Sequence, residues 1–373
     1  MGGSPRKKGN DVNHGWPSGA ALQRPGWSPS HSGEWMISPS GRHRIGSSAR
    51  SARGTAPEVA VLRAYVELPP RREVFEQLEA RRTAVAVGQL LTTWALIIAS
   101  WALCVWVTPW AAPLALIIIG TRQRALGNQI HNASHGGVAR GAGLNRHLIE
   151  LLACWASFED FEQYRLQHLR HHAHLGDHKR DPDYLDDVVV GQGSRWVLAW
   201  RFFKGYGLSR GLWKQSMLAT LPAASAQARL RMAVWWAVVL AGCFAAAGVP
   251  GVAWFAGLWL VSRATVYHLV KVFAELSDHI GLVPGTIASY TRNLPDTWAS
   301  FFFHPHSDNY HLAHHLFPKV PLQQLPRLHR LLVDHPIYKR SEQCQSYFFG
   351  ERAVIASWVK LQGSGRSRQN TTP

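Results

Sequence analysis

Two long stretches without charged side chains dominate the hydrophobic pattern of the chain. Residues 83–121 and residues 232–262 contain no Asp, Glu, Lys or Arg. A helix needs about 20 apolar residues to cross a bilayer core, so the first stretch can cross twice. The second is shorter, and we expect its last helix to continue past Arg263. Proline-containing turns at 108–113 and 249–251 complete the pattern, which predicts an all-α integral membrane protein with four transmembrane helices in two hairpins.

Basic residues flank both stretches and orient them. The flanking residues are Arg71, Arg72, Arg81, Arg82, Arg122 and Arg124 for the first stretch, and Arg229, Arg231, Arg263 and Lys271 for the second. Neither turn carries a charge. The positive-inside rule therefore predicts that both termini lie on the cytoplasmic side. The 17 Trp residues suit anchoring at the membrane interface.

Composition divides the remaining chain. Residues 1–58 are rich in Gly, Ser, Pro and Arg and have few aliphatic side chains to bury, so we expect a disordered basic tail. Residues 59–340 form the expected membrane domain, and residues 341–373 the expected C-terminal tail. The net charge of +17 would suit a nucleic-acid partner, but the long uncharged stretches favour a membrane instead, so no nucleic acid is expected. The four cysteines are widely separated and form no C-x-x-C motif, which excludes a zinc knuckle.

Three histidine clusters carry the candidate chemistry. They are His131 with His135, His168 with His171 and His172, and His311 with His314 and His315, while a single His279 precedes the last. A chain with 20 His in 373 residues would contain roughly 0.06 H-x-x-H-H motifs by chance, so two such motifs indicate selection for a function. Residues three and four apart share a helix face, and imidazole is a good ligand for iron, copper, zinc and nickel. The clusters therefore predict a site for more than one metal ion.

The positions of the clusters predict a shared site outside the bilayer. Every cluster follows a basic flank, so all of them are expected on the cytoplasmic side, held by a helical cap. Nearby carboxylates can accept the free imidazole N–H and orient each ring. The candidates for this role are Asp278, Asp308, Glu162 and Asp177.

Several motifs together resemble the integral-membrane fatty acid desaturase superfamily, which also includes hydroxylases and carotenoid ketolases. The motifs are His131-Asn-Ala-Ser-His135-Gly136, Arg165-x-x-His168-x-x-His171-His172, Asp181-Pro182-Asp183 and Asn309-Tyr-His311-Leu-Ala-His314-His315-Leu-Phe-Pro318. The resemblance covers about residues 85–335. It implies that residues 59–340 form a desaturase-like catalytic domain.

The resemblance also implies a ligand set for two iron ions. The implied ligands are His131, His135, His168, His171, His172, His311, His314 and His315. A ninth histidine often follows the last span in this family, and His279 matches that place better than His268, because it lies further from the hydrocarbon. His304 and His306 are extra histidines that we do not expect to be ligands.

The implied reaction is the O2-dependent introduction of a double bond into a fatty acyl chain, supplied as an acyl lipid or acyl thioester. We expect an apolar, bent tunnel for this chain beneath the metal site. No His-Pro-Gly-Gly segment marks a fused haem domain, so electrons are expected from an external ferredoxin or cytochrome b5. The same absence favours a bacterial inner membrane over the endoplasmic reticulum.

Two alternatives stay open at this point. A hydroxylase or ketolase of the same superfamily, acting on a carotenoid, sterol or alkane, would carry the same clusters. A non-catalytic metal transporter would place its ligands within the spans. The two uncharged stretches contain no histidine, which disfavours transport.

Overall fold

The computed structural model describes residues 56–185 and 191–358, and their regular structure is helical. Within these ranges the only β pairing consists of two isolated bridges, Asn293 with Gln343 and Ser346 with Ala353. The prediction of an all-α protein is thus confirmed for the described part of the chain. The tail expected over residues 1–58 lies almost wholly outside the described residues.

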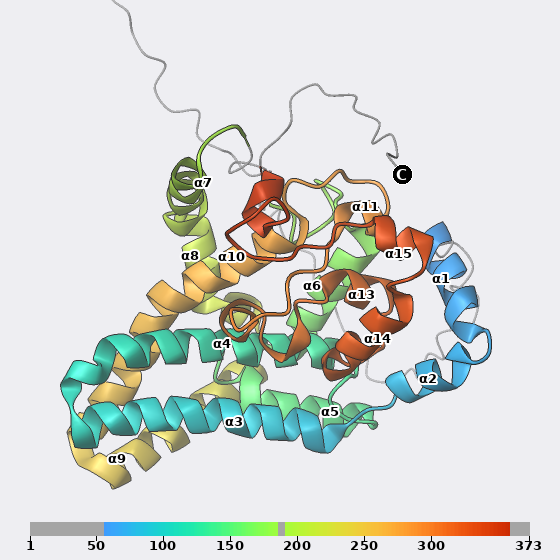
Figure 1. The fold of residues 1–373 in the computed structure, drawn as a ribbon. Coiled ribbons are helices and arrows are strands. Elements are labelled where there is room, and N and C mark those ends of the chain that lie inside the picture. The colour runs from blue at the N-terminus through green and yellow to red at the C-terminus, as the bar shows by residue number, and fades with distance from the viewer. Residues whose placement is uncertain (1–55, 186–190, 359–373) are drawn as a thin grey trace, which may run out of the picture. The chain divides into compact units, whose positions relative to one another are not determined.

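Fifteen α-helices follow one another along the described chain. They are α1 Pro57–Glu67, α2 Arg71–Leu78, α3 Thr83–Ala102, α4 Ala112–Ser134, α5 Ala142–Ile149, α6 Phe161–His174, α7 Arg195–Phe202, α8 Arg210–Leu218, α9 Ala226–Ser262, α10 His268–His279, α11 Ile287–Tyr290, α12 Ser300–Phe303, α13 His311–Leu316, α14 Leu325–Leu332 and α15 Pro336–Arg340 (Figure 1). Side-chain oxygens cap five of them at the N-terminus, from Asp160, Ser194, Ser209, Ser225 and Thr286. Each oxygen accepts a backbone N–H that the first helical turn leaves unpaired.

The first apolar stretch forms a helical hairpin. Helix α3 continues as a π-helical turn, Leu103–Val107, and the chain reverses at Thr108, whose hydroxyl accepts the backbone N–H of Trp110. Helix α4 then returns along α3, and the two pack side by side (Figure 1). The turn therefore lies where the prolines predict it.

The second apolar stretch is also folded back on itself. Helix α9 is interrupted at Ala247 and Gly248, whose backbone is not helical, and the break stands directly before the expected turn. The second arm runs on through a π-helical segment, Arg263–Tyr267, into α10 and ends at His279. By length and hydropathy, the described chain holds two helical segments able to cross a membrane, Thr83–Val107 and Ala226–His279.

Helix α4 lies at the centre of the packing. It contacts α3, α9, α6, α10 and α12, and a first apolar core fills the space between the long helices. Gly120 allows the closest approach, because a Cβ at this position would lie 2.6 Å from the Cβ of Val266. The close contact fixes α4 against the segment that leads into α10.

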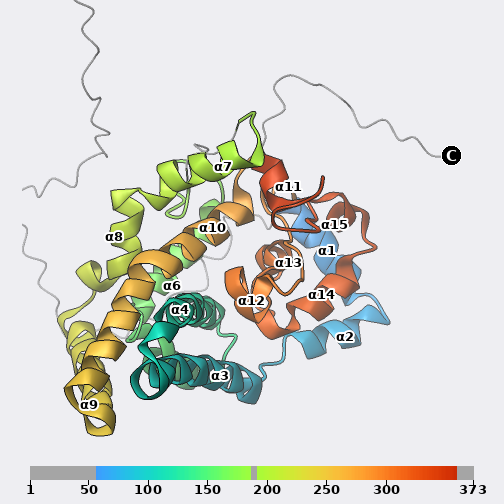
Figure 2. The same cartoon turned by 60° about the vertical axis from the view of Figure 1, so that its left-hand side comes forward.

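Two further cores support the helices beyond the long hairpins. One gathers α1, α2, α14 and α15 around α13, and the other joins α10 and α12 to the chain after α15 (Figure 2). Tyr347, Val354 and Trp358 are buried in the second of these cores. The boundary expected at residue 340 thus falls inside a packed region that extends to Trp358.

Candidate metal centre

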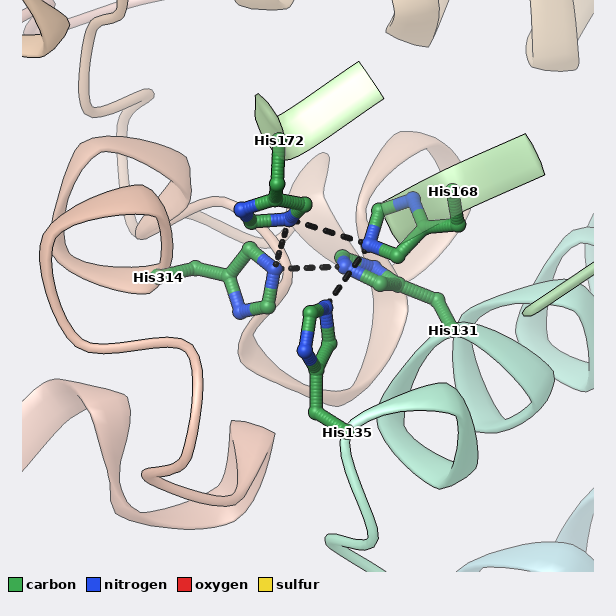
Figure 3. A group of neighbouring side chains, drawn as sticks. All are labelled: His131, His135, His168, His172 and His314. Carbon is green, nitrogen blue, oxygen red and sulfur yellow. Dashed lines mark hydrogen bonds between the residues drawn. The ribbon is translucent and has the colours of Figure 1, made fainter. Parts of the chain in front are cut away.

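Four helices bring all nine predicted histidines together. His131 lies in the last turn of α4 and His135 directly follows that helix, α10 ends with His279, and α6 and α13 carry the H-x-x-H-H motifs. The rings form two groups, and within each group one ring nitrogen of every histidine lies within 4.8 Å of the others. The first group is His131, His135, His168, His172 and His314 (Figure 3), and the second is His171, His279, His311 and His315.

Each H-x-x-H-H motif divides between the two groups. On α6, His168 and His172 enter the first group and His171 enters the second. On α13 the division is reversed, with His311 and His315 in the second group and His314 in the first. Successive residues on a helix are about 100° apart, so the residues at i and i+4 point to one side and the residue at i+3 points to the other. Two helices therefore connect both groups.

The facing nitrogens are close. In the first group the Nε2–Nε2 distances are 2.7 Å for His131–His314, 2.8 Å for His135–His168, 3.0 Å for His168–His172 and 3.1 Å for His172–His314. In the second group they are 3.0 Å for His311–His315, 3.2 Å for His279–His311 and 3.4 Å for His171–His315. Neighbouring corners of an octahedron with metal–nitrogen bonds of about 2.1 Å are about 3 Å apart. The spacing in both groups therefore suits ligands of one ion each.

Oxygen acceptors orient three of the rings. His131 Nδ1 lies 3.0 Å from Asp308 Oδ1, His171 Nδ1 lies 2.8 Å from Asp181 Oδ1, and His279 Nδ1 lies 2.9 Å from the carbonyl oxygen of Tyr290. An ionised carboxylate or a carbonyl only accepts hydrogen bonds, which assigns the proton to Nδ1. In these rings the Nε2 lone pair then points into the group, as metal binding requires.

Burial keeps most of the rings neutral. It is the main cause that lowers the pKa of His135 and of His279 to about 3, with neighbouring histidines adding to the effect. The pKa values of His168, His172, His311, His314 and His315 are also well below the usual value for the same reason. At His171 burial acts in the same direction, but the hydrogen bond to Asp181 and the nearby carboxylates outweigh it and raise the pKa.

This donor set fits two transition-metal ions. Neutral imidazoles with converging lone pairs repel one another in a buried site unless a cation lies between them. Nitrogen ligands of this kind suit iron, copper, zinc and nickel. Ligation by these nine histidines stays a prediction, which the geometry supports.

Of the four carboxylates expected to orient the rings, only Asp308 contacts an imidazole Nδ1. Asp308 accepts from His131, whereas Asp278 lies 3.5 Å from His304 Nε2 and 3.8 Å from His311 Nε2 and contacts no Nδ1. The expectation for two others was wrong. Glu162 pairs with Arg146 and Arg165, and Asp177 pairs with Arg180 on the surface. Both lie near the clusters in sequence, but their ion pairs are with arginines and not with the clustered histidines.

Sequence reasoning missed the role of Asp181. Gly176, which has a left-handed φ of 75°, follows α6, and the chain turns back so that Asp181 reaches His171. The carboxylate also accepts the backbone N–H groups of Gly176 and Asp183, so it holds the turn and the ring together. The Asp181-Pro182-Asp183 motif is the feature of the sequence that could have pointed to this contact.

Among residues 56–185 and 191–358, the remaining histidines lie outside both groups. His268 Nε2 is 3.0 Å from the carbonyl oxygen of Gly207, and its Nδ1 is 2.9 Å from the hydroxyl of Ser216. His304 contacts Tyr347 Oη at 3.1 Å. His279 rather than His268 therefore occupies the place nearest the other rings.

A cavity of about 80 Å³ touches both groups, and its lining is polar. Apart from five of the histidines, it is lined by Arg124, Gly127, Asn128, Tyr164, Asp183, Glu275, Asp278 and Asp308. The apolar tunnel expected beneath the metal site is absent from this cavity. Helix α10 is the reason, because Glu275, Asp278 and His279 face the cavity, while its apolar residues Val270 and Phe273 line a separate cavity of about 250 Å³.

Comparisons with known proteins agree with this geometry. The model of the fatty acid desaturase family matches residues 108–343, which include all nine histidines. The chain is also similar to dihydrorhizobitoxine desaturase from Bradyrhizobium elkanii, with 27% identity over 321 residues that cover 80% of this chain and 86% of that protein. Because the family match extends over more than half of the sequence, the chain belongs to the fatty acid desaturase family.

Proposed function

We propose that the protein is a membrane-bound, O2-dependent desaturase that holds two iron ions. The first group would bind one ion through His131, His135, His168, His172 and His314, and the second group would bind the other through His171, His279, His311 and His315. The convergence of their Nε2 atoms into two groups is the observation that carries the proposal. When bound, the iron pair would supply dioxygen activation and the oxidising power needed to break an unactivated C–H bond.

The protein's own residues would prepare the site for this chemistry. Asp308, Asp181 and the Tyr290 carbonyl hold a proton on Nδ1 of their histidines and keep Nε2 free. Asn128 and Tyr164 line the cavity that touches both groups and would contact a substrate bound there. Removal of two hydrogen atoms gives the alkene, and one O2 with two further electrons and two protons balances the reaction by forming two waters.

The electrons would come from a separate protein, a ferredoxin or a cytochrome b5. The chain carries 40 Lys and Arg against 23 Asp and Glu, so an acidic donor would be attracted to it. We further propose four spans, formed by α3, the apolar part of α4 and the two arms of α9, with the histidines and both termini on the cytoplasmic side. The basic flanks of the two hairpins support this orientation.

A fatty acyl chain, in a lipid or a thioester, is the first candidate substrate. A polar substrate is the second, and two observations favour it: the polar lining of the cavity at the metal centre and the similarity to a desaturase that acts on dihydrorhizobitoxine. Methylene groups of an acyl chain would desolvate the charged side chains of this cavity at a cost that a polar substrate avoids.

Product analysis separates these candidates. The chain would be expressed with a competent electron donor, and cells would be supplied with either acyl lipids alone or dihydrorhizobitoxine. Mass spectrometry should detect a product lighter by two hydrogen atoms. A product heavier by one oxygen atom would instead identify a hydroxylase, and no product with iron-loaded protein would reject the proposal.

Metal analysis tests the ligand set. Purified protein should contain two iron ions per chain, and His279→Ala should lower the iron content and abolish turnover. His268→Ala is the matched control, because His268 lies on the same helix and forms its hydrogen bonds with Ser216 and Gly207, outside the two groups. Equal iron content in the two variants would exclude His279 as a ligand.

A further inference from the structure

A larger cavity lies apart from the metal centre, between α3, α4 and the loop that follows α12. Its volume is about 510 Å³, and none of the nine histidines lines it. Helix α12 packs beside α4 (Figure 2), and the cavity opens between this pair and the first turns of α3. Polar side chains project into it from all three sides, among them Gln89, Thr93, Arg122, Ser300, His306 and Asn309.

Arg122 is a buried cation without a counter-charge. Its side chain is 2% exposed, its guanidinium lies 3.7 Å from the centre of the Phe301 ring, and it donates to the Phe301 carbonyl. No carboxylate of the described residues forms an ion pair with it, and its Nε has no hydrogen-bond partner there. The one acid in the lining, Asp296, is exposed and accepts from Tyr310. A buried guanidinium without an anion is costly.

Two more side chains of this cavity have unused polar atoms. Asn309 is 1% exposed and its Nδ2 lacks a partner, as does Nε2 of His306. The backbone at His306 and Ser307 has φ values of 65° and 69°, in the left-handed region that non-glycine residues rarely adopt. Such strain persists where it serves a site, and here it presents the donors to the cavity.

We propose that this cavity binds an anionic group, a carboxylate or a phosphate, with Arg122 as its main contact. An anion would satisfy the guanidinium, Asn309 Nδ2 and His306 Nε2 together, as charge-assisted hydrogen bonds do at other anion sites. Arg122 stands at the end of the uncharged stretch 83–121, where the polar end of a molecule whose chain lies in the bilayer would be found. The ligand is thus the acidic head of a lipid or the carboxylate of a substrate.

Thermal unfolding of the full chain tests the site and distinguishes the two sources. The protein would be placed in phosphatidylcholine nanodiscs, then in discs with added phosphatidylglycerol, and separately in phosphatidylcholine discs with decanoate. A ligand that binds only the folded protein raises its melting temperature. The wild type should respond to at least one anion, to phosphatidylglycerol if the source is a lipid and to decanoate if it is a substrate carboxylate.

Arg122→Gln should remove this response and weaken binding of the active anion roughly tenfold or more, as expected for loss of a charged hydrogen-bond donor. Arg210→Gln is the matched control, because it removes one positive charge from an exposed position on α8 and should keep the response.

A second variant tests the proposal independently, in case Arg122→Gln does not fold. Gly88 lines the cavity on α3, and a Cβ there would meet no atom within 4 Å, so Gly88→Phe would occupy the cavity without touching its charge. It should also lose the response. The proposal is overturned if neither anion stabilises the wild type, or if Arg122→Gln or Gly88→Phe responds as the wild type does.

Discussion

At the scale of single residues, the orientation of each imidazole depends on what its second nitrogen contacts. The sequence predicts which histidines gather, because the spacing of H-x-x-H-H follows directly from the helical repeat. It predicts Asp308 as an acceptor but does not single out Asp181, since Asp177 and Glu162 are as near in sequence. The choice among these carboxylates depends on the turn after α6, where Gly176 reverses the chain and brings only Asp181 to His171.

Asp308 offers a direct test of this orienting role. Burial raises the pKa of its carboxyl, but the hydrogen bond to His131 and the charge of Arg124 outweigh this and lower the pKa to about 2. Asp308→Asn keeps the oxygen and loses the charge, so we expect iron affinity to fall about 10- to 100-fold. Competition with a chelator measures this affinity. Asp177→Asn, on a surface carboxylate without an imidazole contact, should leave it unchanged, and equal loss in both variants would contradict the role of Asp308.

At the scale of elements, the positions of the helical hairpins are visible in the sequence and their facing side chains are not. Uncharged stretches and prolines predict the reversals near residues 108–113 and 249–251, and the chain reverses at these places. Asp278 and His279 of α10 were predicted near the metal site, but Glu275 was not, because it continues an apolar helix and its direction depends on how α10 packs against α4. The periodicity of a sequence predicts which side chains share a helix face, but it does not predict which element packs against that face.

The interruption of α9 requires a glycine. Gly248 has φ 62° and ψ −153°, a region that is essentially closed to residues with a Cβ. We expect Gly248→Ala to lower the free energy of unfolding by about 1–3 kcal/mol, measured as a fall in melting temperature in lipid nanodiscs. In Gly242→Ala, at a helical position of the same arm with open space around the Cβ, stability should be kept or slightly increased. A larger loss of stability in Gly242→Ala than in Gly248→Ala would show that the hairpin tolerates a side chain at its turn.

Glu159, at the junction between α6 and α9, makes the folding stability depend on pH. Burial raises the pKa of Glu159 from 4.5 to about 7, although Thr220 donates a hydrogen bond to it and Arg263 lies nearby. The folded state then holds a proton that the unfolded state loses, so this carboxyl makes stability fall as pH rises from about 4.5 to about 7.

Glu159→Gln removes that titration. Its melting temperature should exceed that of the wild type at pH 8, and the difference should shrink at pH 5. Glu73→Gln, at an exposed position on α2, controls for the loss of one charge. A difference that is the same at both pH values would contradict burial as the cause.

At the scale of the whole molecule, the proposed topology places the tips of the two hairpins on the side opposite the histidines. The four native cysteines are buried, so introduced cysteines can report accessibility. Trp110 and Val249 are 90% and 70% exposed at the tips, and Arg140 is exposed near the first histidine cluster.

A membrane-impermeant maleimide should label Trp110→Cys and Val249→Cys in intact spheroplasts, and Arg140→Cys only after lysis. Labelling of all three from outside would reject the four-span arrangement. Labelling of Arg140→Cys alone from outside would reverse its orientation.

The division of each H-x-x-H-H motif also bears on biosynthesis. Both histidine groups need α13, which supplies His314 to one and His311 and His315 to the other. A nascent chain that has emerged only as far as α10 contains six of the nine histidines, and both groups are still incomplete. If the two groups bind iron as proposed, each ion would be inserted only after translation has passed residue 315, and chains truncated before that point should retain neither ion.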